Sequence, residues 1–141
     1  MNDFLISIFI DTNLRSTKLL LILHTMKMKL GYLCSSTSWG GLEMNQLRNA
    51  KAMQDRGHRV LIIGQKESPI IQNASRLNIP YYIVQKKTGH YQWAFAWKLS
   101  KVLLQKEFQH LIFRNNREMS LAASIAFFSF GKIRVHYFME M

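Results

Sequence analysis

A loop rich in serine and glycine, at residues 35–41, is the part of the sequence whose residue types and spacing best suit the binding of a ligand. It follows a short apolar segment and opens directly onto a helical pattern. Two adjacent glycines let a ligand approach the backbone closely, and the free N–H groups of the helix, at its positive dipole end, favour an anion. A glycine pair alone is also typical of a plain turn. The candidate binding residues of this loop are Trp39, Gly40, Gly41 and Glu43.

Two arginines form a second candidate binding site. Arg114 and Arg117 lie at the end of a short apolar segment that begins at His110 and is typical of a strand. Guanidinium groups bind phosphate through paired hydrogen bonds, so the two side chains could hold a phosphate or an acceptor sugar. The alternative is that both are solvated charges in a turn.

Catalytic and metal-binding patterns are not recognisable in the sequence. The five histidines have no metal-ligand spacing with one another or with the single cysteine, Cys34, which we expect to be a buried thiol. No Ser-His-Asp arrangement and no paired carboxylate site is detectable. We therefore assign no catalytic residue, no metal and no cofactor. His58 is expected to be structural, whereas His90 and His136 either contact an acceptor or are packing or solvent-exposed residues.

The helix that must position the loop has a regular apolar pattern over residues 41–56. Its expected buried stripe consists of Met44, Leu47, Ala50 and Met53. Gly57 follows where the end of a helix favours a left-handed glycine, and residues 60–64 are typical of a buried strand. Strand, loop, helix and strand therefore form one βαβ unit.

The same alternation continues along the chain. The sequence predicts further helices over 68–78, 92–108 and 118–130, and further strands over 79–85, 110–114 and 132–138. This pattern predicts an α/β fold, a Rossmann-like parallel sheet with helices on both faces. Right-handed crossovers bring the carboxyl ends of the strands to one rim, where ligands bind. The glycine loop, residues 65–67, the basic loop 86–90 and residues 114–117 are expected to share that rim.

The first βαβ unit resembles the amino-terminal end of GT-B glycosyltransferases, particularly those of family 4. That family carries a Gly-Gly-x-Glu pattern in its first loop and often a Gly-His before its second strand. Here Gly40-Gly41-Leu42-Glu43 and Gly57-His58 match these patterns. The resemblance covers about residues 28–141, and beyond the first unit it rests on the order of the elements.

The resemblance implies that the chain is the acceptor-side, N-terminal half of a GT-B fold. Such an enzyme transfers a sugar from a nucleotide-sugar donor, which is a substrate rather than a cofactor, to a saccharide or lipid-linked acceptor. It also implies a setting in cell-envelope polysaccharide or lipopolysaccharide synthesis. In the family a second domain supplies most donor contacts, so a second-domain polypeptide is an expected partner. We expect residues 26–141 to be a truncated domain or half of a split enzyme, inactive by itself.

Residues 1–25 differ from the α/β part. Their apolar patches, at 4–10 and 19–23, are separated by polar and charged residues and are too short to span a membrane. They also match a secretory signal peptide poorly. We expect either a poorly ordered leader or an over-extended reading frame, and a membrane-surface anchor is the alternative.

The formal net charge of +11 favours anionic partners. In the helix predicted over 92–108, Trp93 and Trp97 share one stripe, with Lys98 and Lys101 beside it. Such a stripe suits a helix lying on the headgroups of an inner-leaflet membrane surface. The alternative is that it packs against a neighbouring helix or a second domain. We therefore expect a cytoplasmic protein, peripheral at the cytoplasmic membrane.

Two other classes of protein fit parts of the sequence. A dinucleotide-binding domain would need G-x-G-x-x-G spacing and an acidic residue after its second strand, where this chain has Gly64-Gln65. A non-enzymatic basic module for anionic membrane or nucleic acid explains the charge but not the glycine pair. Because no nucleic-acid-binding motif is present, nucleic acid is not an expected partner.

Overall fold

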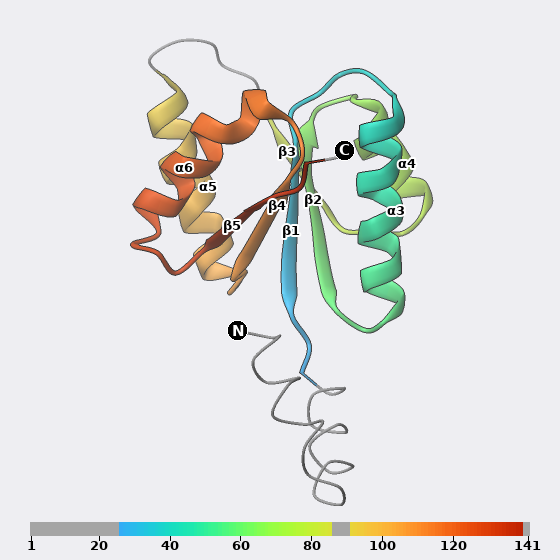
Figure 1. The fold of residues 1–141 in the computed structure, drawn as a ribbon, viewed down its shortest axis with the longest axis horizontal. Helices are drawn as coiled ribbons and strands as arrows, with labels where there is room; N and C mark the ends of the chain where they lie inside the picture. The colour runs from blue at the N-terminus through green and yellow to red at the C-terminus, as the bar shows by residue number, and fades with distance from the viewer. Residues whose placement is uncertain (1–25, 86–90, 140–141) are drawn as a thin grey trace, which may run out of the picture.

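The computed structural model describes residues 26–85 and 91–139, and these residues form an α/β domain (Figure 1). Five parallel strands lie in the order β3-β2-β1-β4-β5, with helices on both faces. The predicted fold class is therefore confirmed. The strands are β1 (Lys29–Cys34), β2 (Arg59–Gln65), β3 (Tyr81–Val84), β4 (His110–Phe113) and β5 (Arg134–Tyr137). The helices are α3 (Gly41–Asp55), α4 (Pro69–Arg76), α5 (Tyr91–Gln105) and α6 (Met119–Phe128), with a 3-10 turn, η1 (Asn116–Glu118), before α6.

The sheet lies between two layers of helices, and its strands β1 and β2 are buried on both faces. Their register sets Leu30 beside Val60 and Leu33 beside Ile63, within the runs 30–34 and 60–64, which are buried and carry no charged residue. Continuous apolar strands are typical of a parallel sheet covered on both sides. Helices α3 and α4 cover one face and α5 and α6 the other, so the core consists of two apolar layers.

Three local predictions agree with the structure. Helix α3 ends at Asp55, and Gly57 follows with a φ of 90°, the left-handed conformation that favours glycine. Cys34 is a buried free thiol. His58 is structural, since its Nδ1 accepts a hydrogen bond from the Met28 amide at 3.2 Å and so ties the helix-to-strand turn to the start of β1.

One predicted core residue is wrong. Met44 is exposed, whereas Leu47 and Ala50 are buried as expected. The buried face of α3 includes Glu43 and Gln46 in place of Met44. Glu43 accepts a hydrogen bond from the Gly40 amide, and Gln46 donates one to the Leu33 carbonyl oxygen. Apolar spacing alone therefore misplaces the first turn of this helix.

Gly64 in β2 is a position where an added methyl group has little room. A Cβ there would lie 3.0 Å from the side chain of Ile71 and 3.3 Å from the carbonyl oxygen of Cys34. We expect Gly64→Ala to lower the free energy of unfolding by about 1–2 kcal/mol through overpacking. Gly41→Ala is the matched control, because a Cβ at this exposed helical position meets nothing within 4 Å. It should hold or raise the stability, since alanine favours a helix over glycine.

Urea unfolding of both variants checks this prediction. Equal losses in the two variants would show that packing around Gly64 is not the cause.

Within the part of the chain that the structure describes, no helix is long and apolar enough to cross a membrane.

Candidate binding site

A pocket lies at the carboxyl ends of the strands, where β1 and β4 are neighbours. The chain leaves β1 toward one face of the sheet and β4 toward the other, and ligands of open α/β sheets bind at such a point. The pocket has a volume of about 470 Å³, within the usual range for small-molecule sites. It brings together the loop after β1, the ends of β2 and β3, and the segment after β4. These described segments share one rim, as predicted, while residues 86–90 lie outside the described part.

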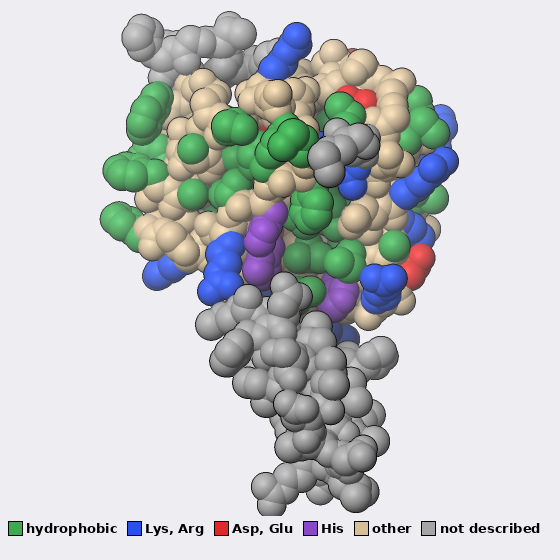
Figure 2. Space-filling view, in the orientation of Figure 1, with side chains coloured by type: hydrophobic (Ala, Val, Ile, Leu, Met, Phe, Trp, Pro, Cys, Tyr) green, Lys and Arg blue, Asp and Glu red, His purple; other side chains and the backbone are tan. Residues whose placement is uncertain are grey.

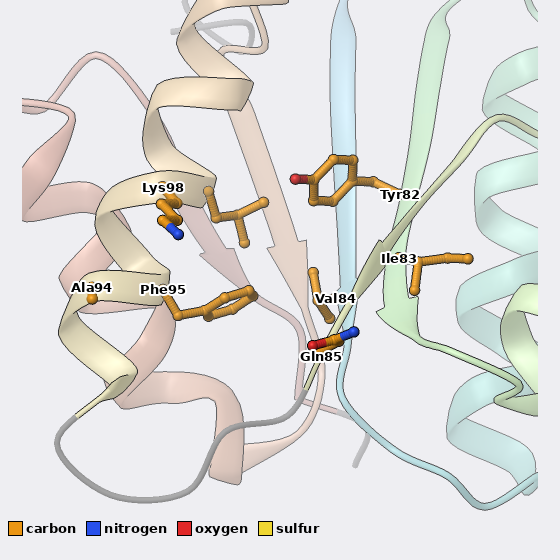
Figure 3. Close-up of a pocket in the computed structure, with 8 residues that line it drawn as sticks. Tyr82, Ile83, Val84, Gln85, Ala94, Phe95 and Lys98 are labelled. Atoms are coloured by element: carbon orange, nitrogen blue, oxygen red, sulfur yellow. The ribbon is translucent and has the colours of Figure 1, made fainter.

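The lining of the pocket combines polar and apolar side chains. Hydroxyl groups come from residues 35–38, and amide groups from Gln65, Gln85, Gln92 and Asn115. The apolar side chains include Val84 and Phe95. Figure 3 shows an adjoining recess, in which Phe95 reaches from α5 toward Val84 and Gln85 at the end of β3. The pocket therefore offers many uncharged hydrogen-bonding groups beside an aromatic wall.

Glu118 holds the loop that follows β1. Its buried carboxylate accepts a hydrogen bond from the Ser35 amide, and the Gln65 side-chain amide donates one to the Ser35 carbonyl oxygen. Burial raises the pKa of Glu118, and hydrogen bonds from Ser35 offset this only in part. The peptide groups around Ser35 are thus fixed from both sides, by Glu118 after β4 and by Gln65 at the end of β2.

Glu43 caps helix α3. Its carboxylate accepts a hydrogen bond from the Gly40 amide at 2.9 Å and one from the Ser38 hydroxyl at 3.4 Å. Burial opposes ionisation, but hydrogen bonds, led by one from Ser36, outweigh it and lower the pKa of Glu43. The carboxylate therefore compensates the positive end of the helix dipole. It also accepts the hydrogen bond of the Gly40 amide, which the sequence had predicted to bind an anionic group of a ligand.

The remaining predicted residues lie in different places. Gly41 and Trp39 are exposed beside the pocket, with 41% of the Trp39 surface accessible. Arg117 is exposed and lines the pocket. Arg114 is half-buried, and its positive charge acts on the Tyr32 hydroxyl. Burial raises the pKa of Tyr32 to about 12, and the charge of Arg114 lowers it in part. The two arginines therefore do not line the same pocket.

Of the two histidines considered for acceptor contact, the structure describes only His136, which is not brought to the pocket. His90 lies outside the described residues. The side chain of His136 in β5 lies 2.9 Å from that of His110 in β4 and lines no part of the pocket. Among the described residues, no three histidine, cysteine or acidic side chains are grouped so that they could hold a metal ion.

Sequence reasoning missed Glu118 and Gln46 as residues that shape the site, and it placed Gln65 on the rim without its hydrogen bond to the loop. Gln46 lies buried in α3 and donates a hydrogen bond to the Leu33 carbonyl oxygen at 2.9 Å. One signal was present for Glu118, a polar residue just before α6 at the rim. A polar residue at a helix start is ordinarily solvated, so the pattern alone did not separate Glu118 from surface residues, and Gln46, inside α3, carried no such signal.

Comparison with known proteins shows the fold. No protein-family model matches the sequence, and no curated protein matches it. Among solved structures, HepE of Anabaena in complex with UDP-glucose is 17% identical, with a TM-score of 0.62 over 78% of this chain and 28% of HepE. MurG of Acinetobacter baumannii is 15% identical, with a TM-score of 0.62 over 80% of this chain and 35% of MurG. A glycosyltransferase from Rickettsia africae is 13% identical, with a TM-score of 0.63 over 81% of this chain and 29% of that enzyme.

These similarities agree with the expected likeness to GT-B glycosyltransferases at the level of the fold. The chain spans about a third of the length of the structures that it matches.

Proposed function

We propose that this chain is the acceptor-side half of a GT-B glycosyltransferase. In the complete enzyme a sugar passes from a nucleotide-sugar donor to a saccharide or lipid-linked acceptor that binds in the pocket beside β1 and β4. A second-domain polypeptide supplies most contacts to the donor, as the resemblance implies. The resemblance also implies an acceptor from cell-envelope polysaccharide or lipopolysaccharide synthesis.

The observation that carries this proposal is the lining of the pocket. Hydroxyl and amide groups that are uncharged match the hydroxyl groups of a sugar, and Phe95 offers an aromatic wall for the apolar face of a sugar ring. Arg117 is the cation among the lining residues, so it suits an acceptor that carries a phosphate or carboxylate. The fold likeness to HepE, which binds UDP-glucose, supports a nucleotide-sugar as the donor.

The carboxylates near the pocket hold the loop. Glu118 binds the Ser35 amide and Glu43 binds the Gly40 amide. Glu118 also lines the pocket, and we assign neither carboxylate a catalytic role. We therefore assign to the described residues the binding and orientation of the acceptor.

Titration of the isotope-labelled chain with saccharides, followed by NMR, tests the proposal. The probes are neutral disaccharides, hexose phosphates and hexosamine phosphates. We expect at least one to shift the amide signals of residues 35–38 and 115–118. Arg117→Ala should weaken the binding of a sugar phosphate about tenfold, the effect of one charge-assisted hydrogen-bonded pair.

Arg56→Ala is the matched control, because Arg56 is exposed at the far end of α3, away from the pocket. It should leave the affinity for sugar phosphates unchanged. The proposal fails if two results are found together. The first is that no saccharide shifts the amide signals of residues 35–38 and 115–118. The second is that inorganic polyphosphate binds in a salt-sensitive manner, and equally well to Arg117→Ala and Arg56→Ala. That result would instead favour a non-enzymatic basic module.

A further inference from the structure

Two histidine side chains join the edge strand β5 to its neighbour β4. The Nδ1 atom of His110 lies 2.9 Å from the Nε2 atom of His136, and the two ring centroids are 5.2 Å apart. Both side chains are half-buried. In the parallel register His110 is opposite Arg134 and His136 is opposite Ile112. Because side chains alternate along a strand, both rings lie on the face of the sheet where Ile112 packs.

Strand β5 is fastened to the sheet by few groups. It is four residues long, lies at the edge of the sheet and pairs with β4 among the described strands. The Arg134 amide donates to the Gln109 carbonyl oxygen at 2.8 Å, and the Phe138 amide donates to the Phe113 carbonyl oxygen at 3.1 Å. Short edge elements open more readily than central strands, so a side-chain contact between β4 and β5 changes how often β5 opens.

The surroundings of the histidine pair are positively charged. The other charged or titratable groups on this face are Arg134 of β5, Arg114 just after β4, and Tyr32 of β1, whose hydroxyl donates to Asn49 in α3. The charges that act on His110 are those of His136 and Arg134. Figure 2 shows histidine side chains at the surface over β4 and β5, beside lysine or arginine and without an acidic side chain next to them.

The acidic residues that the structure describes are engaged elsewhere. Glu107 pairs with Lys29, and Asp55 pairs with Lys51. Glu67 is exposed beyond the carboxyl end of β2. The two remaining carboxylates bind amides of the loop after β1, as described above. No carboxylate of the described residues therefore compensates a second positive charge on the histidine pair.

Tyr137 connects β5 to the pocket. Its ring meets that of Phe113 with centroids 5.2 Å apart, and its hydroxyl donates a hydrogen bond to the side-chain oxygen of Asn116. Asn116 begins the turn η1, whose next two residues, Arg117 and Glu118, line the pocket. Opening of β5 therefore removes a hydrogen bond from the segment that carries both of these pocket residues.

We propose that His110 and His136 form a pH-sensitive latch, which fastens β5 to β4 and, through Tyr137, holds residues 116–118 in place beside the pocket. The two states are β5 docked on β4 and β5 released from it. In the docked state one imidazole donates a hydrogen bond to the other, which requires one N–H group and one unprotonated nitrogen. When both rings are protonated, all their nitrogens are donors. The hydrogen bond is then lost, and two positive charges face each other beside Arg134.

Acid favours the released strand. Burial lowers the pKa of His110, and the charges of His136 and Arg134 lower it further. A lowered pKa in the docked state contributes stability above the ordinary pKa of 6.5, and this contribution is lost as the pH falls through the lowered value. The ratio of released to docked β5 should therefore rise as the pH falls from 7 to 5, by roughly tenfold for one excluded proton.

The latch controls the pocket from residues that do not line it. An effect of pH on acceptor binding through this latch rests on the proposed function. The latch itself is measured on the chain without any ligand. Failure of the latch and failure of the proposed function are therefore separate results.

Amide hydrogen exchange of the full chain between pH 7 and pH 5, followed by NMR, tests the inference. Protection factors correct for the pH dependence of the intrinsic exchange rate. They are compared for the Arg134 and Phe138 amides, at the two ends of β5, and for the Ile62 amide of the central strand β2. We expect the protection of both β5 amides to fall roughly tenfold relative to Ile62 as the pH is lowered.

The double variant His110→Gln with His136→Gln should abolish this fall, because glutamine keeps hydrogen-bonding groups and does not titrate. His58→Gln is the matched control. It removes a half-buried histidine that binds the Met28 amide, away from β5, and should leave the pH dependence of β5 unchanged. The inference is overturned if the β5 amides follow Ile62 at every pH, or if the double variant retains the fall.

Tyr137→Phe tests the connection to the pocket, because it removes the hydroxyl and keeps the ring beside Phe113. The comparison is made with Glu118→Gln also present, so that the titration of this carboxyl does not contribute. With Tyr137 in place, the amide signals of residues 115–117 should shift between pH 7 and pH 5 in step with β5. With phenylalanine they should stay constant. Equal shifts with and without the hydroxyl would contradict the role assigned to Tyr137.

Discussion

Ile63→Ala is expected to lower the free energy of unfolding by about 3–4 kcal/mol, which would be the largest loss from a single truncation considered in this chain. Ile63 lies in the middle of β2 and is completely buried in the layer between the sheet and helices α5 and α6. Its Cδ1 lies 3.6 Å from where a Cβ of Gly31 would be, so it fills the space that this glycine leaves. Removing three carbon atoms there leaves a cavity that the rigid central strands cannot close.

Ile83→Ala is the matched control, because it makes the same chemical change in the neighbouring strand. Ile83 lies on β3 and is 43% exposed, so its truncation should cost less than about 1 kcal/mol. Guanidinium unfolding monitored by circular dichroism measures both losses. Similar values for the two variants would contradict the assignment of β2 as a central strand covered on both faces. A loss of 3–4 kcal/mol is a large fraction of the stability of a typical domain, so Ile63→Ala is measured best at low temperature.

The order of helices and strands could be predicted because the local signals agree with the tertiary structure. Strands β1 and β2 contain the continuous apolar runs 30–34 and 60–64, and the helix between them is followed by Gly57, whose φ of 90° suits glycine. Periodicity and end signals are sufficient where packing and propensity favour the same answer. They failed for Met44, because the first turn of α3 is oriented by the polar bonds of Glu43 and Gln46 rather than by apolar burial.

The candidate site could be predicted only in part. The rim position of the loop after β1 follows from the topology, but the direction of each side chain does not. Arg114 and Arg117 are three residues apart, yet Arg114 acts on Tyr32 while Arg117 lines the pocket. Helix α6 shows the same limit, because it is apolar nearly throughout and its sequence does not indicate that Phe127 would be exposed.

Glu118→Ala should lower the free energy of unfolding by about 2 kcal/mol, because it leaves the Ser35 amide without its partner in a buried position. Glu67→Ala is the control, since Glu67 is an exposed acid on the same rim and its loss should cost less than about 0.5 kcal/mol. NMR should also show broadened or shifted signals for residues 35–38 in Glu118→Ala alone. Unchanged signals there would show that Glu118 does not hold the loop.

The pH dependence of Glu118→Gln gives a sharper test of the same contact. Burial raises the pKa of Glu118 above its ordinary value of 4.5, so the folded chain keeps this proton to a higher pH than the unfolded chain does. Stability therefore falls as the pH rises from about 4.5 through the raised pKa, because the unfolded state then binds fewer protons. Glutamine does not titrate. The stability of Glu118→Gln relative to the native chain should accordingly improve as the pH rises over this window.

Glu43→Gln should show the opposite dependence, which makes the two acids controls for each other. Hydrogen bonds hold the pKa of Glu43 below 4.5, so its ionised form stabilises the folded chain above that pH, and this contribution is lost as the pH falls through the lowered pKa. The deficit of Glu43→Gln, about 1 kcal/mol at neutral pH, should shrink toward zero in acid. Urea unfolding of both variants between acid and neutral pH measures the two slopes. If the stability differences of the two variants changed with pH in the same direction, one of the two pKa shifts would have the wrong sign. The loop after β1 would then not be held by one carboxyl group with a raised pKa and another with a lowered pKa.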